Sequence, residues 1–107
     1  MTQNILYGGD EVLVVHLDPY ADMHAADYDF EVELFADGSC NKLVVKKEKM
    51  TKVNEDDYEL VLYTSMVGRG MLHAIATCYI PDSRCDSMYR KVKVDLLKDS
   101  EIKYRII

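Results

Sequence analysis

The sequence predicts an all-β protein, a two-sheet antiparallel sandwich of seven or eight short strands. Apolar and acidic residues alternate over residues 28–36, which is the period of a strand with one buried face. Turn signals recur about every 8 to 12 residues. No segment combines a helical period with capping residues. For a chain of 107 residues, one domain over 1–107 with an immunoglobulin-like architecture is the leading arrangement, and a small barrel is the alternative.

The first strands precede the clearest one. Residues 5–7 are predicted as a short edge strand that ends at Gly8 and Gly9. Residues 12–17 form a Val-rich apolar run, which suits a buried strand. Residues 18–27 open with Asp-Pro and are mixed in polarity, so they are predicted as a loop.

The strand at 28–36 is followed by Asp37-Gly38, a signal for a two-residue type I′ hairpin loop. That loop would fix the register of the next strand. One face would pair apolar residues and the other would pair acids with lysines. The expected opposite pairs are Val32 with Leu43, Phe30 with Val45, Glu33 with Lys42, and Asp29 with Lys46.

Further strands are predicted downstream of a charged stretch at 46–52, which is expected to be a strand end and a loop. They cover residues 58–64, 71–80, 88–97 and 102–106. Gly68-Arg69-Gly70 is read as a hairpin turn that needs positive φ. Both faces of the 71–80 strand are fairly apolar, so this strand is expected at the centre of a sheet.

The charge distribution excludes some partners. The net charge is −6, which disfavours nucleic acids and anionic membranes because both require clustered Lys and Arg. Residues 1–41 hold nine acids and no Lys or Arg, whereas residues 42–107 carry a net charge of +3. These two charge sets either face each other within one molecule or drive head-to-tail association between molecules.

The three cysteines, Cys40, Cys78 and Cys85, form no CxxC motif. No basic and apolar leader opens the sequence, and no apolar run is long enough for a membrane span. The thiols are therefore expected to be reduced in a cytoplasm, with Cys78 as a small core residue.

The search for catalytic chemistry finds no motif. The densest polar cluster lacks metal-ligand spacing, and strand neighbours in it would face opposite ways, so no metal is expected. Cys78 and His73 have opposite parity in one strand, and Cys85 has only Arg84 nearby to lower its pKa. No enzyme activity and no cofactor are expected. The polar cluster comprises His16, Asp18, Asp22, His24, Asp27 and Asp29.

Three pieces of the sequence carry a resemblance to a known group. They are DYDFEV at 27–32, DYELVLYT at 57–64 leading through Gly68-x-Gly70-x-Leu72, and YIPD at 79–82 followed by RKV at 90–92. In this order they resemble small β-sandwich proteins of prophages from gut bacteria, similar in kind to the N-terminal domain of phage baseplate upper proteins. The resemblance covers residues 27–94.

The resemblance implies a non-enzymatic structural module of a phage tail or baseplate. Such a module would contact copies of itself or other virion proteins through loops and edge strands. It would lie in the bacterial cytoplasm during assembly and then in the virion. The contacts are expected in the loop 65–71 and the corner 81–89, with Arg69, Arg84 and Tyr89 as the contact residues.

Other functions stay open. A small-ligand or carbohydrate-binding sandwich would need exposed tyrosines grouped with Asp or Asn on one face. A metal-dependent enzyme would use the cluster between His16 and Asp29. The sequence also allows an accessory chain with no function of its own.

Overall fold

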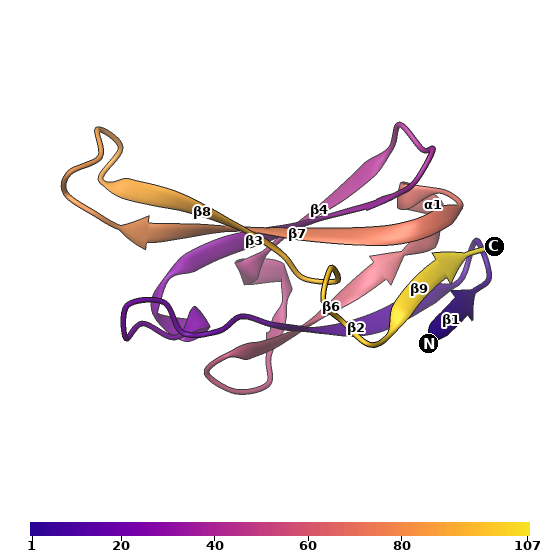
Figure 1. The fold of residues 1–107 in the computed structure, drawn as a ribbon, viewed down its shortest axis with the longest axis horizontal. Coiled ribbons are helices and arrows are strands. Elements are labelled where there is room, and N and C mark those ends of the chain that lie inside the picture. The colour runs from indigo at the N-terminus through magenta and orange to yellow at the C-terminus, as the bar shows by residue number, and fades with distance from the viewer.

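A computed structural model describes residues 1–107 and contains two β-sheets, which confirms the all-β prediction (Figure 1). The short helical segments are η1 (Ala25–Asp27), η2 (Lys47–Lys49) and α1 (Thr64–Val67). No helix is long and apolar enough to cross a bilayer. The strands are β1 (Thr2–Ile5), β2 (Asp10–His16), β3 (Asp29–Ala36), β4 (Lys42–Lys46), β5 (Thr51–Lys52), β6 (Asp57–Tyr63), β7 (Gly70–Pro81), β8 (Tyr89–Asp95) and β9 (Lys103–Ile106).

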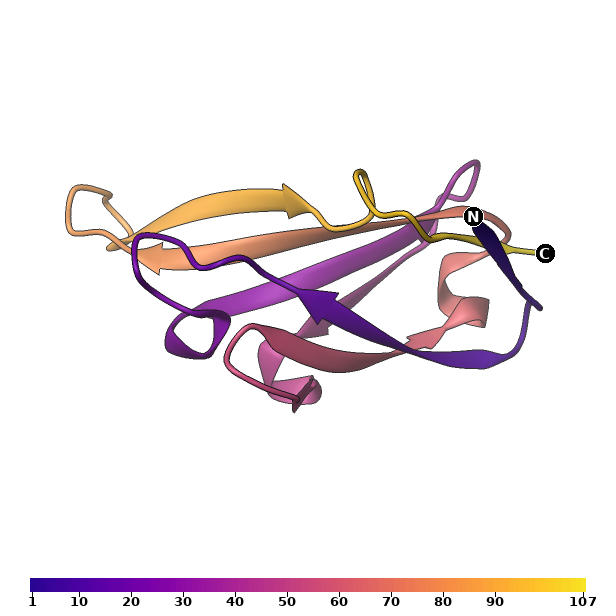
Figure 2. The same cartoon turned by 60° about the horizontal axis from the view of Figure 1, so that its bottom comes forward.

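The two sheets differ in size and pack face to face (Figure 2). The larger has the order β1-β9-β7-β3-β4, and β8 also pairs with β7. The smaller has the order β2-β6-β5. All pairs are antiparallel except β1 with β9. β3 occupies one edge of β7. Strands β8 and β9 therefore follow each other along the opposite edge of β7.

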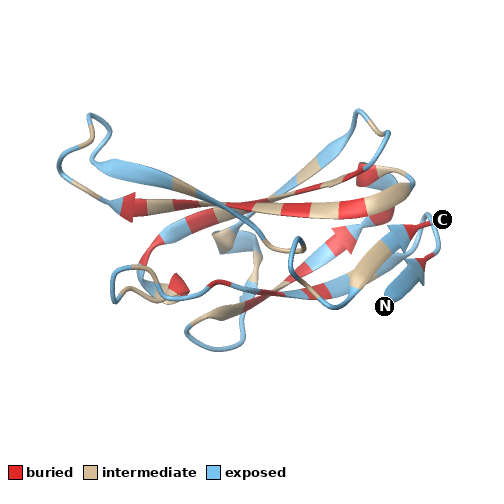
Figure 3. Ribbon diagram, in the orientation of Figure 1, coloured by how far each residue is buried: buried red, intermediate tan, exposed pale blue.

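The core lies between the sheets (Figure 3). The prediction that β7 is central is confirmed, since it pairs with β3, β8 and β9. Its even-numbered residues from Leu72 to Ile80 are all buried. They pack with the buried face of β3 and with Leu60 and Leu62 of β6. The alternation read from the sequence therefore places the apolar side chains of both strands inside.

The predicted register of the β3–β4 hairpin is wrong by two residues. Residues 37–41 form a longer loop, and only Gly38 has positive φ (+79°), whereas a type I′ turn needs two such residues. A shift of two residues leaves every side chain on the face of the sheet that was predicted for it. The Lys42 Nζ atom still lies 3.0 Å from Glu33 Oε1, now as a diagonal neighbour. The observed opposite pairs include Val32 with Val45, Leu34 with Leu43, and Glu31 with Lys46.

The glycine turn before β7 also differs from the prediction. Gly68 and Gly70 do have positive φ, +90° and +131°. However, β6 and β7 belong to different sheets, so the turn is a crossover and not a hairpin. Thr64 begins α1 instead of ending the strand, and its side chain is buried. Its hydroxyl donates to the Gly9 carbonyl at 2.7 Å and accepts from the Gly8 amide at 2.8 Å, which ties the crossover to the β1–β2 turn.

The first strand also begins earlier than predicted. The structure places it at Thr2–Ile5, and residues 7–8 lie in a turn. The reason is its partner, because β1 pairs in parallel with β9 from the far end of the chain. A pairing between the two termini leaves no local signal in the sequence.

Candidate interaction surfaces

The outer face of the smaller sheet carries exposed apolar side chains. Val12 and Val14 of β2 are 57% and 60% exposed, and Val61 and Tyr63 of β6 are 38% and 47% exposed. Val12 lies directly opposite Val61. We call these four residues the valine face. A contiguous group of this kind on one sheet surface indicates a contact region, because single exposed apolar residues are ordinary but groups are not.

Strands β2 and β4 are both sheet edges. Each pairs with one neighbour only, β2 with β6 and β4 with β3. No backbone group of Asp10–His16 or Lys42–Lys46 makes a hydrogen bond outside its own sheet. Each edge therefore presents a row of free amide and carbonyl groups, which another strand could bind.

The two edges differ in charge. Exposed or half-exposed acids flank β2, and exposed lysines flank β4. Of the nine acids in residues 1–41, only Glu33 forms an ion pair with a lysine or arginine, namely Lys42. The charge asymmetry of the sequence is thus mostly left unpaired within the molecule. The acidic edge comprises Asp10, Glu11 and Asp18 with Asp99, which lines a hollow together with β2, and the basic edge comprises Lys42, Lys46 and Lys49.

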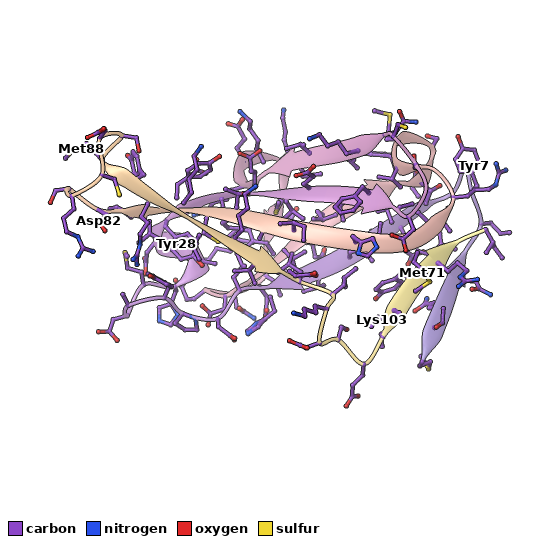
Figure 4. All side chains as sticks on the ribbon, turned by 45° about the horizontal axis from the view of Figure 1, so that its top comes forward. Tyr7, Tyr28, Met71, Asp82, Met88 and Lys103 are labelled. Carbon is purple, nitrogen blue, oxygen red and sulfur yellow. The ribbon has the colours of Figure 1, made fainter.

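The three predicted contact residues do not come together. Arg69 is exposed, and its guanidinium carbon lies 4.3 Å from the centroid of the Tyr7 ring. Arg84 and Tyr89 lie in the β7–β8 hairpin at the opposite end, beside Asp82 and Met88 in Figure 4. Arg84 binds the Asp82 carboxylate through Nε at 2.9 Å and Nη2 at 2.8 Å. These bonds lower the pKa of Asp82 to about 2.

Tyr89 belongs to a hollow on the outer face of the larger sheet. The hollow has a volume of about 370 Å³. The Tyr79 hydroxyl donates to Glu31 Oε1 at 2.5 Å, and this bond raises the pKa of Tyr79. The sequence analysis did not identify this pair, although alternation puts both residues on outer faces. The lining residues are Asp29, Phe30, Glu31, Lys46, Tyr79 and Tyr89.

The polar cluster between His16 and Asp29 is divided in the structure. His16 Nδ1 lies 2.6 Å from Asp57 Oδ1, and its Nε2 lies 3.0 Å from Asp18 Oδ1. His24 Nδ1 instead lies 2.9 Å from Asp56 Oδ1. No group of three or more His, Cys, Asp or Glu side chains is arranged to hold a metal ion.

The histidines give the stability a predicted pH dependence. The hydrogen bond that the His16 ring donates to the Asp57 carboxylate raises the pKa of His16 above 6.5. A raised folded-state pKa contributes stability that is complete below 6.5 and lost as the pH rises through the folded value. The melting temperature should therefore fall between about pH 6 and pH 8. His16→Gln should flatten this fall, as measured by thermal unfolding across pH, and an unchanged slope would contradict the assignment.

The Cys78 thiol and His73 lie on different faces of β7. All three cysteines are free. Cys78 is buried, which raises the pKa of its thiol. His73 lies on the opposite face of β7, where its Nε2 is 2.6 Å from Asp37 Oδ1. Cys78 and His73 therefore do not face each other.

No family is matched. No family model, curated protein or solved structure matches the chain. A function for this chain is therefore inferred from its surfaces and from the sequence resemblance.

Proposed function

We propose that this protein is a non-enzymatic interaction module that binds other proteins through its edge strands and loops. The observation that carries the proposal is the unpaired β2 edge beside the valine face. Natural proteins usually protect an edge of this length with charges, a proline, a bulge or a covering segment. Here the acids stand only near the ends of the strand, and residues 12–15 between them are all apolar, with Val12 and Val14 exposed. Such a strand is suited to pairing with another chain.

The sandwich is proposed to be immunoglobulin-like. The order β2-β6-β5 corresponds to strands B, E and D of that fold, and β4-β3-β7 corresponds to C′, C and F. Strands β8 and β9 then share the place of strand G along the free edge of β7. The strand order in an experimental structure of this chain would test the assignment.

The proposed setting is a phage tail or baseplate, with other virion proteins or copies of the chain as partners. This part rests on the resemblance of residues 27–94. Two measurements test it. The DNA flanking the gene should encode portal, tape-measure or tail-fibre proteins, and purified particles should contain the chain in stoichiometric amount. A metabolic or polysaccharide-uptake operon around the gene, or particles lacking the chain, would contradict the setting.

Charge reversal of an exposed loop arginine should weaken assembly without unfolding the domain. Arg69→Glu removes a stacking contact with Tyr7 that is worth about 0.5–1 kcal/mol, so the melting temperature should change little. Binding to the neighbouring structural proteins should weaken by about tenfold if the loop is a contact. Arg84→Glu is the parallel variant in the other loop. Unchanged binding of both variants, or loss of folding, would contradict the prediction.

A second candidate function is binding of a small ligand or a carbohydrate. The hollow supports it, because Tyr79 and Tyr89 are grouped there with Asp29 and Glu31. Aromatic faces with neighbouring carboxylates are suited to sugar rings and hydroxyls. A glycan panel should then raise the melting temperature, and Tyr89→Ala should remove the effect. Tyr63→Ala, on the other sheet, is the matched control.

A further inference from the structure

We infer that the partner at the β2 edge is a second copy of this chain, which pairs its β4 edge with β2 and so forms a head-to-tail assembly. This inference rests on the proposed interaction role and names the partner. The two edges belong to different sheets: β2 ends the smaller sheet and β4 ends the larger one. A molecule that binds through two different edges leaves one of each free after every addition, so rings or filaments result.

The geometry of the two edges favours antiparallel pairing. β2 and β4 run in the same direction within one molecule (Figure 1). A half-turn between neighbouring copies reverses one strand relative to the other. The same half-turn brings the larger sheet of one copy to the level of the smaller sheet of the next. The outer faces of the two sheets then lie on the same side, and the joined strands continue one sheet.

One register satisfies both the apolar and the charged residues. Val12 of β2 then faces Val44 of the second copy, and both are exposed in the single molecule. In the same register Asp10 faces Lys46 on the outer side, while Leu13 faces Leu43 on the inner side. Apolar pairs at the centre with an acid–lysine pair at one end are the cross-strand combinations that stabilise antiparallel strands.

Charge complementarity favours pairing between β2 of one copy and β4 of the next over a two-fold dimer formed by two β2 edges. A β2–β2 dimer would bring two acidic edges together. A β2–β4 contact instead joins the acidic edge to the basic edge. It also gives a partner to charges that the single molecule leaves unpaired, since Asp10, Lys46 and Lys49 form no ion pair within it.

Cysteine cross-linking tests the register directly. The Val12→Cys and Val44→Cys chains, each with Cys40→Ser and Cys85→Ser, are mixed and oxidised. Facing residues lie within disulfide reach, so the mixture should give a dimer that neither chain gives alone. A chain with both cysteines should give a ladder of covalent oligomers. Val12→Cys mixed with Val53→Cys is the matched control, because Val53 is also exposed but lies outside β4.

A charge swap tests the partner in solution. Asp10→Lys should weaken self-association by at least about tenfold, measured by sedimentation velocity over a concentration series. The double variant Asp10→Lys with Lys46→Asp should restore it, because the two residues meet only between copies. Asp86→Lys, an exposed acid in the β7–β8 loop, should have no effect.

The outcomes separate this inference from the proposed function. A chain that stays monomeric at all concentrations, cross-linking of Val12→Cys with itself, or a double variant without rescue would each overturn the β2–β4 contact. None of these results would remove the chain from virions or from its gene neighbourhood, which are the tests of the proposed function. Cross-linking restricted to the Val12–Val44 pair, together with rescue, supports the inference.

Discussion

Gly70→Ala is expected to lower the free energy of unfolding by at least about 3 kcal/mol. Gly70 has φ of +131°, a conformation that L-residues rarely adopt. A Cβ atom there would lie 2.5 Å from the carbonyl oxygen of Asp37 and 3.3 Å from its amide nitrogen. Both are backbone atoms of the β3–β4 loop and cannot rotate away. Urea or thermal unfolding monitored by far-UV circular dichroism would measure the loss.

Gly8→Ala is the matched control for this prediction. Gly8 also has positive φ, +94°, but nothing lies within 4 Å of the position that its Cβ would occupy. Its replacement should therefore cost only the backbone strain, about 1–2 kcal/mol. If both variants lose the same stability, the close approach of Gly70 to Asp37 is not what constrains this crossover.

Alternation within a strand was sufficient to predict which side chains are buried. Phe30, Val32 and Leu34 lie inside as expected, and so does the even-numbered face of β7. The prediction succeeded because the side-chain period of a strand is a local property of the backbone. Even the wrong hairpin register kept the faces correct, since it was shifted by two residues and not by one.

Features that depend on distant segments were not predictable from the sequence. The Asp37 amide donates to the Met71 carbonyl at 2.9 Å, and the Asp37 side chain meets His73. These contacts come from β7, which lies more than thirty residues further along the chain, and they accompany the longer loop that replaces a type I′ turn. The assignment of β6 and β7 to different sheets is likewise decided by packing and not by the turn sequence.

The candidate surfaces were predicted only in part. The sequence showed an acidic first third and a basic remainder, but not where these charges lie. Their location on two opposite edges follows from the strand order, which places β2 and β4 at the ends of different sheets. Arg69, Arg84 and Tyr89 were chosen from the loops, and the structure adds that Arg84 is already bound to Asp82.

Lys47→Met is expected to lower the free energy of unfolding by about 3 kcal/mol. The Lys47 ammonium donates to the carbonyl oxygens of Ala25, Ala26 and Tyr28 at 3.0, 3.1 and 2.8 Å. It also lies 5.7 Å from the ring centroids of Phe30 and Tyr58. This single cation therefore joins η2 to the segment that enters β3, and burial lowers its pKa.

Methionine keeps the apolar stem of Lys47 but leaves three part-buried carbonyls without their donor, so the loss should come from hydrogen bonding and not from packing. The matched control is Lys49→Met in the same short helix, where the side chain is exposed and makes no hydrogen bond. Its effect should stay within about 0.5 kcal/mol. Chemical denaturation of both variants gives the comparison. Equal stabilities would mean that water replaces the ammonium at the three carbonyls, and that η2 is held by its backbone alone.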